Sequence, residues 1–115
     1  MLTTILLAIV AAVAGGFLYT IVGIIPGTDE TATMVPTTII LVLAGAPAGG
    51  LFAWEVGIIV AMQCSHTIPT AMTGLPGSTM AVPLVQSCTI AKRLGVPHMA
   101  MRKMAAGSVV GTIFV

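Results

Sequence analysis

The run from Leu2 to Ile25 limits the possible folds most strongly, because it spans 24 residues without a charged side chain. At about 1.5 Å per residue, a helix of that length reaches about 36 Å, enough to cross a hydrocarbon core of ~30 Å with some tilt. Gly15 and Gly16 lie inside the run, where small residues allow a neighbouring helix to approach closely. We therefore predict a first membrane span over residues 2–25.

The composition agrees with a membrane protein. Of 115 residues, 57% are hydrophobic and 6% are charged, whereas a soluble domain carries about 25% charged residues. The net charge is +1, which provides no basic face for nucleic acid. Cys64 and Cys88 have neither a metal-ligand nor a redox spacing, so we interpret them as buried, unreactive thiols. We expect an all-α, multi-pass protein of a cell membrane, in contact with lipid.

The rest of the chain alternates between apolar runs and helix-breaking residues. A second span is predicted over residues 37–53, although Pro47 should kink or end it. Residues 56–91 are apolar at both ends, but Cys64 to Pro83 contains three prolines and two glycines. Irregular backbone inside a bilayer must be covered by protein or line a wet cavity, and such breaks form binding sites in transporters. We predict a broken, re-entrant helical hairpin, with the break beginning at Gln63.

All four basic residues lie between Lys92 and Lys103. The excess of Lys and Arg in cytoplasmic loops predicts a cytoplasmic loop over residues 92–103, either a short basic loop or a surface helix. We prefer this interpretation to a site for phosphate or anionic lipid. Residues 104–115 begin a further span but are too few to complete it, since a span needs about 20 residues. We therefore expect a section of a longer protein, or one completed by further chains.

A short internal repeat marks the candidate site. Gly-Ile-Ile-Pro-Gly-Thr (23–28) and Thr-Gly-Leu-Pro-Gly-Ser (73–78) align at an offset of 50 residues. Paired Pro/Gly interruptions point to a transporter site, and a helix beginning after Ser78 and running to Ala91 would offer N–H donors to a carboxylate. The predicted substrate-binding residues are Pro26, Gly27, Thr28, Thr73, Gly74, Pro76, Gly77, Ser78 and Thr79.

Two ionisable residues are weaker candidates for ion coupling. Asp29 and Glu30 follow Thr28, which can cap a new helix, and acids suit the first turn of that helix; alternatively, Asp29 is an acidic ligand for a coupling cation. His66 is either a hydrogen-bonded interior histidine, which we prefer, or a proton-coupling group. No catalytic triad, Walker loop or metal-ligand spacing is present, so we expect no enzyme, no metal site and no cofactor other than Na⁺ or H⁺ as coupling ion.

Several motifs together resemble a known family, the large membrane subunit of tripartite tricarboxylate transporters, in its N-terminal part. The matching elements are Gly-Ile-Ile-Pro-Gly (23–27) followed by Pro36, the small-residue stretch 43–50, Gly-Leu-Pro-Gly-Ser (74–78), and the tail residues 91–95, Ala100 and 108–111. The resemblance covers the chain from about Gly15 onward.

The resemblance implies a permease of a bacterial or archaeal inner membrane that carries di- or tricarboxylates in symport with an ion. It also implies two partners, a small membrane subunit and an extracytoplasmic solute-binding protein. Two other functions stay open from the residues themselves. The chain is alternatively a small structural or assembly subunit of a larger membrane complex, or a pore-forming oligomer lined by residues 64–79.

Overall fold

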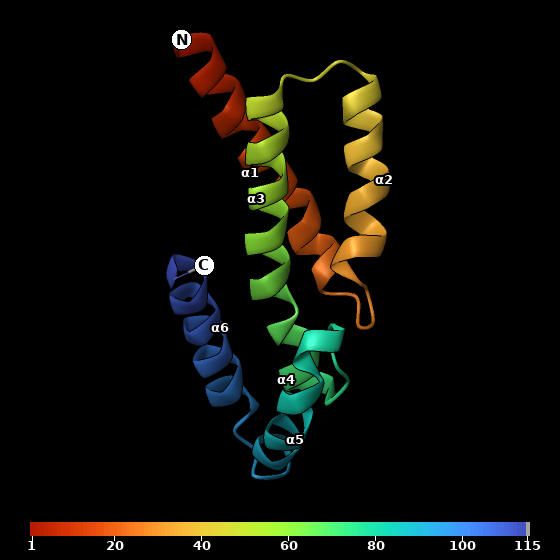
Figure 1. The fold of residues 1–115 in the computed structure, drawn as a ribbon. Helices are drawn as coiled ribbons and strands as arrows, with labels where there is room; N and C mark the ends of the chain where they lie inside the picture. Colours follow the sequence, from red (N-terminus) through yellow and green to blue (C-terminus); the bar gives the residue numbers. More distant parts are fainter. Residues whose placement is uncertain (115) are drawn as a thin grey trace.

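A computed structural model describes residues 1–114, except for the side chain of Met80. It is all-helical in this range, as predicted (Figure 1). The elements are α1 (Leu2–Gly23), α2 (Glu30–Leu43), α3 (Ala48–Ser65), α4 (Thr67–Thr73), the 3₁₀ helix η1 (Thr79–Leu84), α5 (Val85–Arg93) and α6 (Pro97–Phe114).

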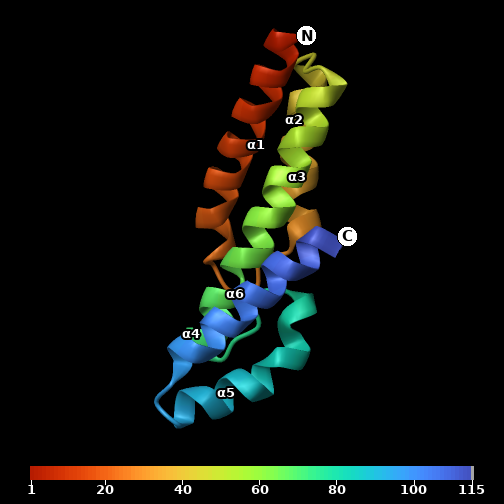
Figure 2. The ribbon, with the colours of Figure 1, turned by 90° about the vertical axis from the view of Figure 1, so that its left-hand side faces the viewer.

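The molecule is elongated, with extents of 52 × 25 × 20 Å. The helices α1, α2 and α3 form one half, whereas α4, η1 and α5 lie at the other end, and α6 turns back beside α3 and α4 (Figures 1 and 2). Two helical paths are long and apolar enough to cross a membrane by length and composition. These are Leu2–Gly23 and the 26-residue path Ala48–Thr73.

Small residues bring α1 and α3 into close contact. A Cβ added at Gly57 would overlap the backbone of Ala12, and one added at Gly23 would lie 2.6 Å from the Ser65 Cβ. Such approach is what small residues permit between apolar helices. Tyr19, Ile58 and Met62 form the buried cluster beside this interface.

Polar contacts attach α2 to this pair of helices. The Tyr19 hydroxyl donates to the Thr33 carbonyl oxygen at 2.7 Å, and the Thr38 hydroxyl donates to Glu55 Oε1 at 2.6 Å. Because these groups are partly buried, their hydrogen bonds fix the position of α2 against α1 and α3.

Residues 37–53 do not form the predicted second span. Instead α2 ends at Leu43, the chain turns through Gly45 at φ +78°, and α3 begins at Ala48 with Pro47 in the N-cap position. Pro47 thus separates two helices, because its fixed φ suits a helix start and not an interior. Only the first of the two candidate crossing paths, Leu2–Gly23, follows a predicted span closely.

The helix also continues further into the polar stretch than predicted. It passes Gln63, is interrupted at His66 alone, and ends at Thr73, followed by Gly74 in a left-handed conformation with φ +76°. Threonine hydroxyls donate to carbonyls one turn back, including Thr70 to His66 at 2.8 Å. Pro69 lies in the first turn of α4, where its missing N–H leaves no intrahelical bond unmade. Between Gln63 and Thr79, the backbone outside helices is therefore limited to His66 and residues 74–78.

The predicted basic loop is mostly helical. Lys92 and Arg93 lie in the last turn of α5, Arg102 and Lys103 lie in α6, and only residues 94–96 connect the two helices. Pro97 starts α6, a position that proline favours. The predicted span over residues 104–115 is the end of α6, with Val115 outside the described residues. The cytoplasmic placement of this segment stays a prediction.

Candidate functional site

The two Pro-Gly motifs lie against each other in the structure. The Gly27 N–H donates to the Gly77 carbonyl oxygen at 3.2 Å, although the two residues are 50 positions apart in the chain. Gly27 has φ +83° in the turn that follows α1, a conformation that glycine adopts without steric cost. The internal repeat therefore corresponds to a direct contact between two chain breaks.

Gly77 is held against the turn at His66. Its N–H donates to Thr70 Oγ1 at 3.0 Å, and Gly77 is buried. A Cβ at this position would lie 2.6 Å from the His66 carbonyl oxygen, too close for any side chain without movement of the backbone. This contact requires glycine at position 77 and places the second motif beside His66.

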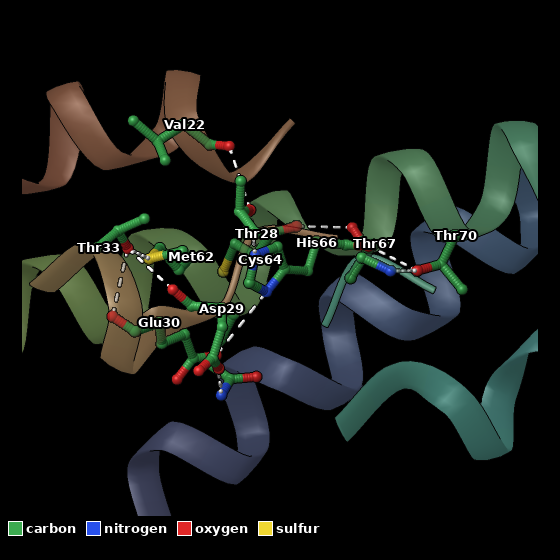
Figure 3. Close-up of polar contacts among 12 residues, drawn as sticks. Val22, Thr28, Asp29, Glu30, Thr33, Met62, Cys64, His66, Thr67 and Thr70 are labelled. Carbon is green, nitrogen blue, oxygen red and sulfur yellow. Dashed lines mark hydrogen bonds and ion pairs between the residues drawn. The ribbon is translucent and has the colours of Figure 1, made fainter. Parts of the chain in front are cut away.

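Thr28 connects the first motif to the same histidine. Its hydroxyl donates to the Ile25 carbonyl oxygen at 2.9 Å. The same hydroxyl oxygen lies 3.4 Å from His66 Nε2 (Figure 3). The prediction that Thr28 caps α2 is wrong, because Asp29 occupies the N-cap position and Thr28 bonds back to the end of α1. No side-chain bond caps α2.

Glu30 and Gln63 complete the surroundings of His66. Glu30 Oε1 accepts a hydrogen bond from Gln63 Nε2 at 3.0 Å and lies 3.7 Å from His66 Nδ1. The side chain of His66 is 4% exposed, whereas that of Glu30 is 23% exposed, and Nδ1 has no hydrogen-bond partner. Burial raises the pKa of the Glu30 carboxyl, and the charge of neighbouring Asp29 raises it further.

The sequence patterns missed Glu30 and Gln63 as site residues. Glu30 was interpreted as a first-turn acid, and Gln63 as the residue at which the apolar run stops. Both polar residues occur in a chain of mostly apolar segments, where a polar side chain needs a partner. That placement was a signal by which Glu30 and Gln63 could have been found. Asp29, the predicted acidic ligand, is itself exposed.

Ser78 is buried but is not the predicted cap of an α-helix. It occupies the N-cap position of the 3₁₀ helix η1, and its hydroxyl makes no capping bond. The continuous helix expected up to Ala91 is instead η1 followed by α5. Ser78 lines a small cavity of about 70 Å³, together with Gln63, His66, Thr67, Ala81, Leu84 and Met104.

The remaining predicted residues lie away from this cavity. Thr73 and Gly74 line an open pocket of about 480 Å³ with Thr89, Lys92 and Arg93. The Lys92 ammonium group donates to the Thr73 carbonyl at 3.4 Å. Pro26 and Thr79 are exposed and Pro76 is half-buried. The fold thus brings together Gly27, Thr28, His66 and Gly77, places Ser78 in the adjoining cavity, and leaves Pro26, Thr73, Gly74, Pro76 and Thr79 outside it.

The cysteines do not contribute to a metal site in the described part of the chain. Cys88 is buried with its Sγ 3.2 Å from Met104 Sδ, Cys64 is half-buried, and both are free thiols. Within residues 1–114, no group of three or more His, Cys, Asp or Glu side chains is arranged to hold a metal ion.

Comparisons with known proteins add no further constraint on the site. No protein-family profile, curated protein or solved structure matches this chain.

Proposed function

We propose that this chain is a section of an ion-coupled secondary transporter for organic anions, of the di- and tricarboxylate class. The observation that carries the proposal is the contact between Gly27 and Gly77, which joins two helix-breaking motifs beside His66. Paired interruptions of apolar helices form substrate sites in transporters, because freed backbone groups and hydroxyls there can face a solute. The resemblance to the large subunit of tripartite tricarboxylate transporters supports the substrate class.

The cavity next to this contact suits one carboxylate group. Ser78 offers a hydroxyl donor and Gln63 offers an amide, whereas the Thr67 hydroxyl already donates to the Cys64 carbonyl oxygen at 2.6 Å. Hydrogen bonds to an ionised carboxylate are stronger than those between neutral groups. A volume of about 70 Å³ admits a carboxylate but not a whole tricarboxylate. We infer that further protein encloses the rest of the substrate in a multi-pass assembly of a bacterial or archaeal inner membrane.

Transport by the reconstituted protein tests the proposal. In proteoliposomes, uptake of radiolabelled citrate or succinate should saturate with concentration and should require an imposed ion gradient. Flux that rises linearly with concentration would instead indicate a pore, and absence of carboxylate binding and flux would indicate a structural subunit.

A single substitution tests where the carboxylate binds. Losing a hydrogen bond to a charged group costs about 1.5–3 kcal/mol, so Ser78→Ala should weaken carboxylate binding about tenfold or more. Because the Ser78 hydroxyl makes no capping bond, the melting temperature should change little. Ser87→Ala, at an exposed position of α5, is the matched control and should leave affinity unchanged. Unchanged affinity in Ser78→Ala would place the carboxylate elsewhere.

A further inference from the structure

The hydrogen-bond network assigns the tautomer of neutral His66. Thr28 has one hydroxyl hydrogen, and the Ile25 carbonyl at 2.9 Å takes it. The Thr28 oxygen that faces Nε2 at 3.4 Å is therefore an acceptor, and Nε2 carries the ring hydrogen. Nδ1 of neutral His66 is then left with a lone pair, inside a side chain that is 4% exposed and with no partner for that atom.

This lone pair faces another acceptor. Glu30 Oε1 lies 3.7 Å from Nδ1, and an ionised carboxylate can only accept hydrogen bonds. Two acceptors in a partly buried site repel unless a proton resides on one of them, giving either a protonated carboxyl or an imidazolium. Gln63 donates to the same oxygen but cannot supply this proton, because its amide does not titrate.

We propose that Glu30 and His66 hold one exchangeable proton between them, and that this proton is the coupling ion of the transporter. The role of this proton as the coupling ion rests on the proposed function. When the proton leaves, the O–H bond of Glu30 or the N–H bond of His66 breaks, and the proton passes to water or to the carboxylate of Asp29. No other group is oxidised, reduced or transferred.

The surrounding charges are consistent with a single proton site. Asp29 and Glu30 lie beside His66 at the start of α2 (Figure 3), and Asp29 is exposed to solvent. Helices α1, α4 and η1 contain no Asp, Glu, Lys, Arg or His, and Glu55 of α3 instead accepts a bond from Thr38. Helices α5 and α6 both pack against α4; the charged residues of α5 are Lys92 and Arg93, and the charged or titratable residues of α6 are His98, Arg102 and Lys103. Within the described chain, none of these five forms an ion pair with Glu30 or His66.

A sodium ion suits this site less well than a proton. Hard cations prefer several oxygen ligands, whereas the group facing Glu30 here is an imidazole nitrogen. The Gln63 amide presents its nitrogen, and not its oxygen, to the same carboxylate. We therefore commit to H⁺, and Na⁺ dependence is an outcome of the test.

The proton site is connected to the Pro-Gly contact by two short paths. His66 Nε2 faces Thr28, the residue after Gly27, and the His66 backbone packs against Gly77. A change in the charge of His66 alters its bond to Thr28. Protonation is therefore coupled through His66 to the contact between the two Pro-Gly motifs. This is the physical link that coupling of ion and substrate requires.

The first measurement detects the proton without transport. In the reconstituted protein labelled with ¹⁵N-histidine, the His66 ring shifts should titrate, and Glu30→Gln should move the titration midpoint by about one pH unit or more. His98→Gln identifies the second histidine signal, and Glu55→Gln is the matched carboxylate control that should leave the His66 midpoint unchanged. A His66 midpoint that is the same in Glu30→Gln and Glu55→Gln overturns the shared proton site.

The second measurement tests coupling. In sodium-free proteoliposomes, an inwardly directed proton gradient, with the outside acidic, should drive carboxylate accumulation. Glu30→Gln should reduce this accumulation at least tenfold, while exchange of substrate across the membrane (counterflow) continues. Carboxylate accumulation that is driven by a Na⁺ gradient and is unaffected by Glu30→Gln overturns the inference and leaves the proposed function standing. Absence of counterflow in the unmodified protein overturns the proposed function, and with it the coupling role. The ¹⁵N titration then decides the proton site by itself.

Discussion

Replacing Gly77 by alanine should destabilise the protein by breaking the contact between the two Pro-Gly motifs. The added Cβ would lie 2.6 Å from the His66 carbonyl oxygen and 2.9 Å from its Cα, both of which are backbone atoms. An ordinary contact begins at 3.4 Å, so the two segments must separate by about 0.8 Å. The bond from Gly27 to Gly77, now 3.2 Å, and the bond from Gly77 to Thr70, now 3.0 Å, would then exceed hydrogen-bonding distance.

The expected cost follows from these two effects. Overpacking costs about 1–3 kcal/mol, and each lost hydrogen bond costs about 1 kcal/mol. A total of about 3–5 kcal/mol lowers the melting temperature by roughly 10–20 °C. Thermal unfolding in detergent, followed by circular dichroism, measures this change.

Gly111→Ala is the matched control for this substitution. A Cβ at Gly111 meets nothing within 4 Å, and the residue lies inside α6. Alanine there should be neutral or stabilise the helix by about 0.5–1 kcal/mol. If Gly77→Ala melts at the same temperature as the unmodified protein, the close contact with His66 does not exist. The site formed by the two Pro-Gly motifs must then be abandoned.

Three further predictions concern the helix pair, the buried acid and the topology. Gly57→Ala should destabilise the packing of α1 on α3 by about 1–3 kcal/mol, since its Cβ would overlap the Ala12 backbone. Gly49→Ala is the control, because a Cβ there meets nothing within 4 Å. A melting temperature of Gly57→Ala equal to that of this control would contradict the packing. The pKa of Glu30 is raised in the folded state by burial, so its contribution to stability is complete below the ordinary pKa of a glutamate carboxyl and is lost as pH rises through the folded pKa. The melting temperature of the unmodified protein relative to Glu30→Gln should therefore increase on acidification, and equal pH profiles would refute the raised pKa. Finally, Leu94→Cys, in a background with both native cysteines replaced by alanine, should react with an impermeant thiol reagent only after cells are permeabilised, because the basic residues favour the cytoplasmic side; labelling of intact cells would reverse the topology.

Some of the site was predictable because it depends on local chemistry. The Pro-Gly motifs at 26–27 and 76–77 were recognised as chain breaks, since proline lacks a donor and glycine permits positive φ. Their match in sequence suggested a shared role, and the structure shows them hydrogen-bonded to each other. That bond depends on how α1 packs against α3, and on how α4 follows the end of α3, which no local pattern describes.

Other features were mispredicted because local rules competed with packing. Pro69 and the polar residues after Gln63 indicated a broken helix, yet α4 forms there because threonine hydroxyls bond to its carbonyls and Pro69 falls in the first turn. The span over residues 37–53 was inferred from hydrophobicity that in fact belongs to two helices separated by a turn.

The sequence by itself determined that this chain is helical and that its first 25 residues suit a bilayer, because hydrophobicity and the absence of charge are properties of each segment alone. It also indicated a break at Pro26-Gly27 and another between Gln63 and Thr79, which the structure narrows to His66 and residues 74–78. Only the tertiary structure decided that Glu30 of α2 faces His66 at the end of α3. That meeting depends on the crossing of α1 and α3 and on the turns at either end of α2. These long-range contacts are set by the packing of whole helices, and therefore no single stretch of sequence specifies them.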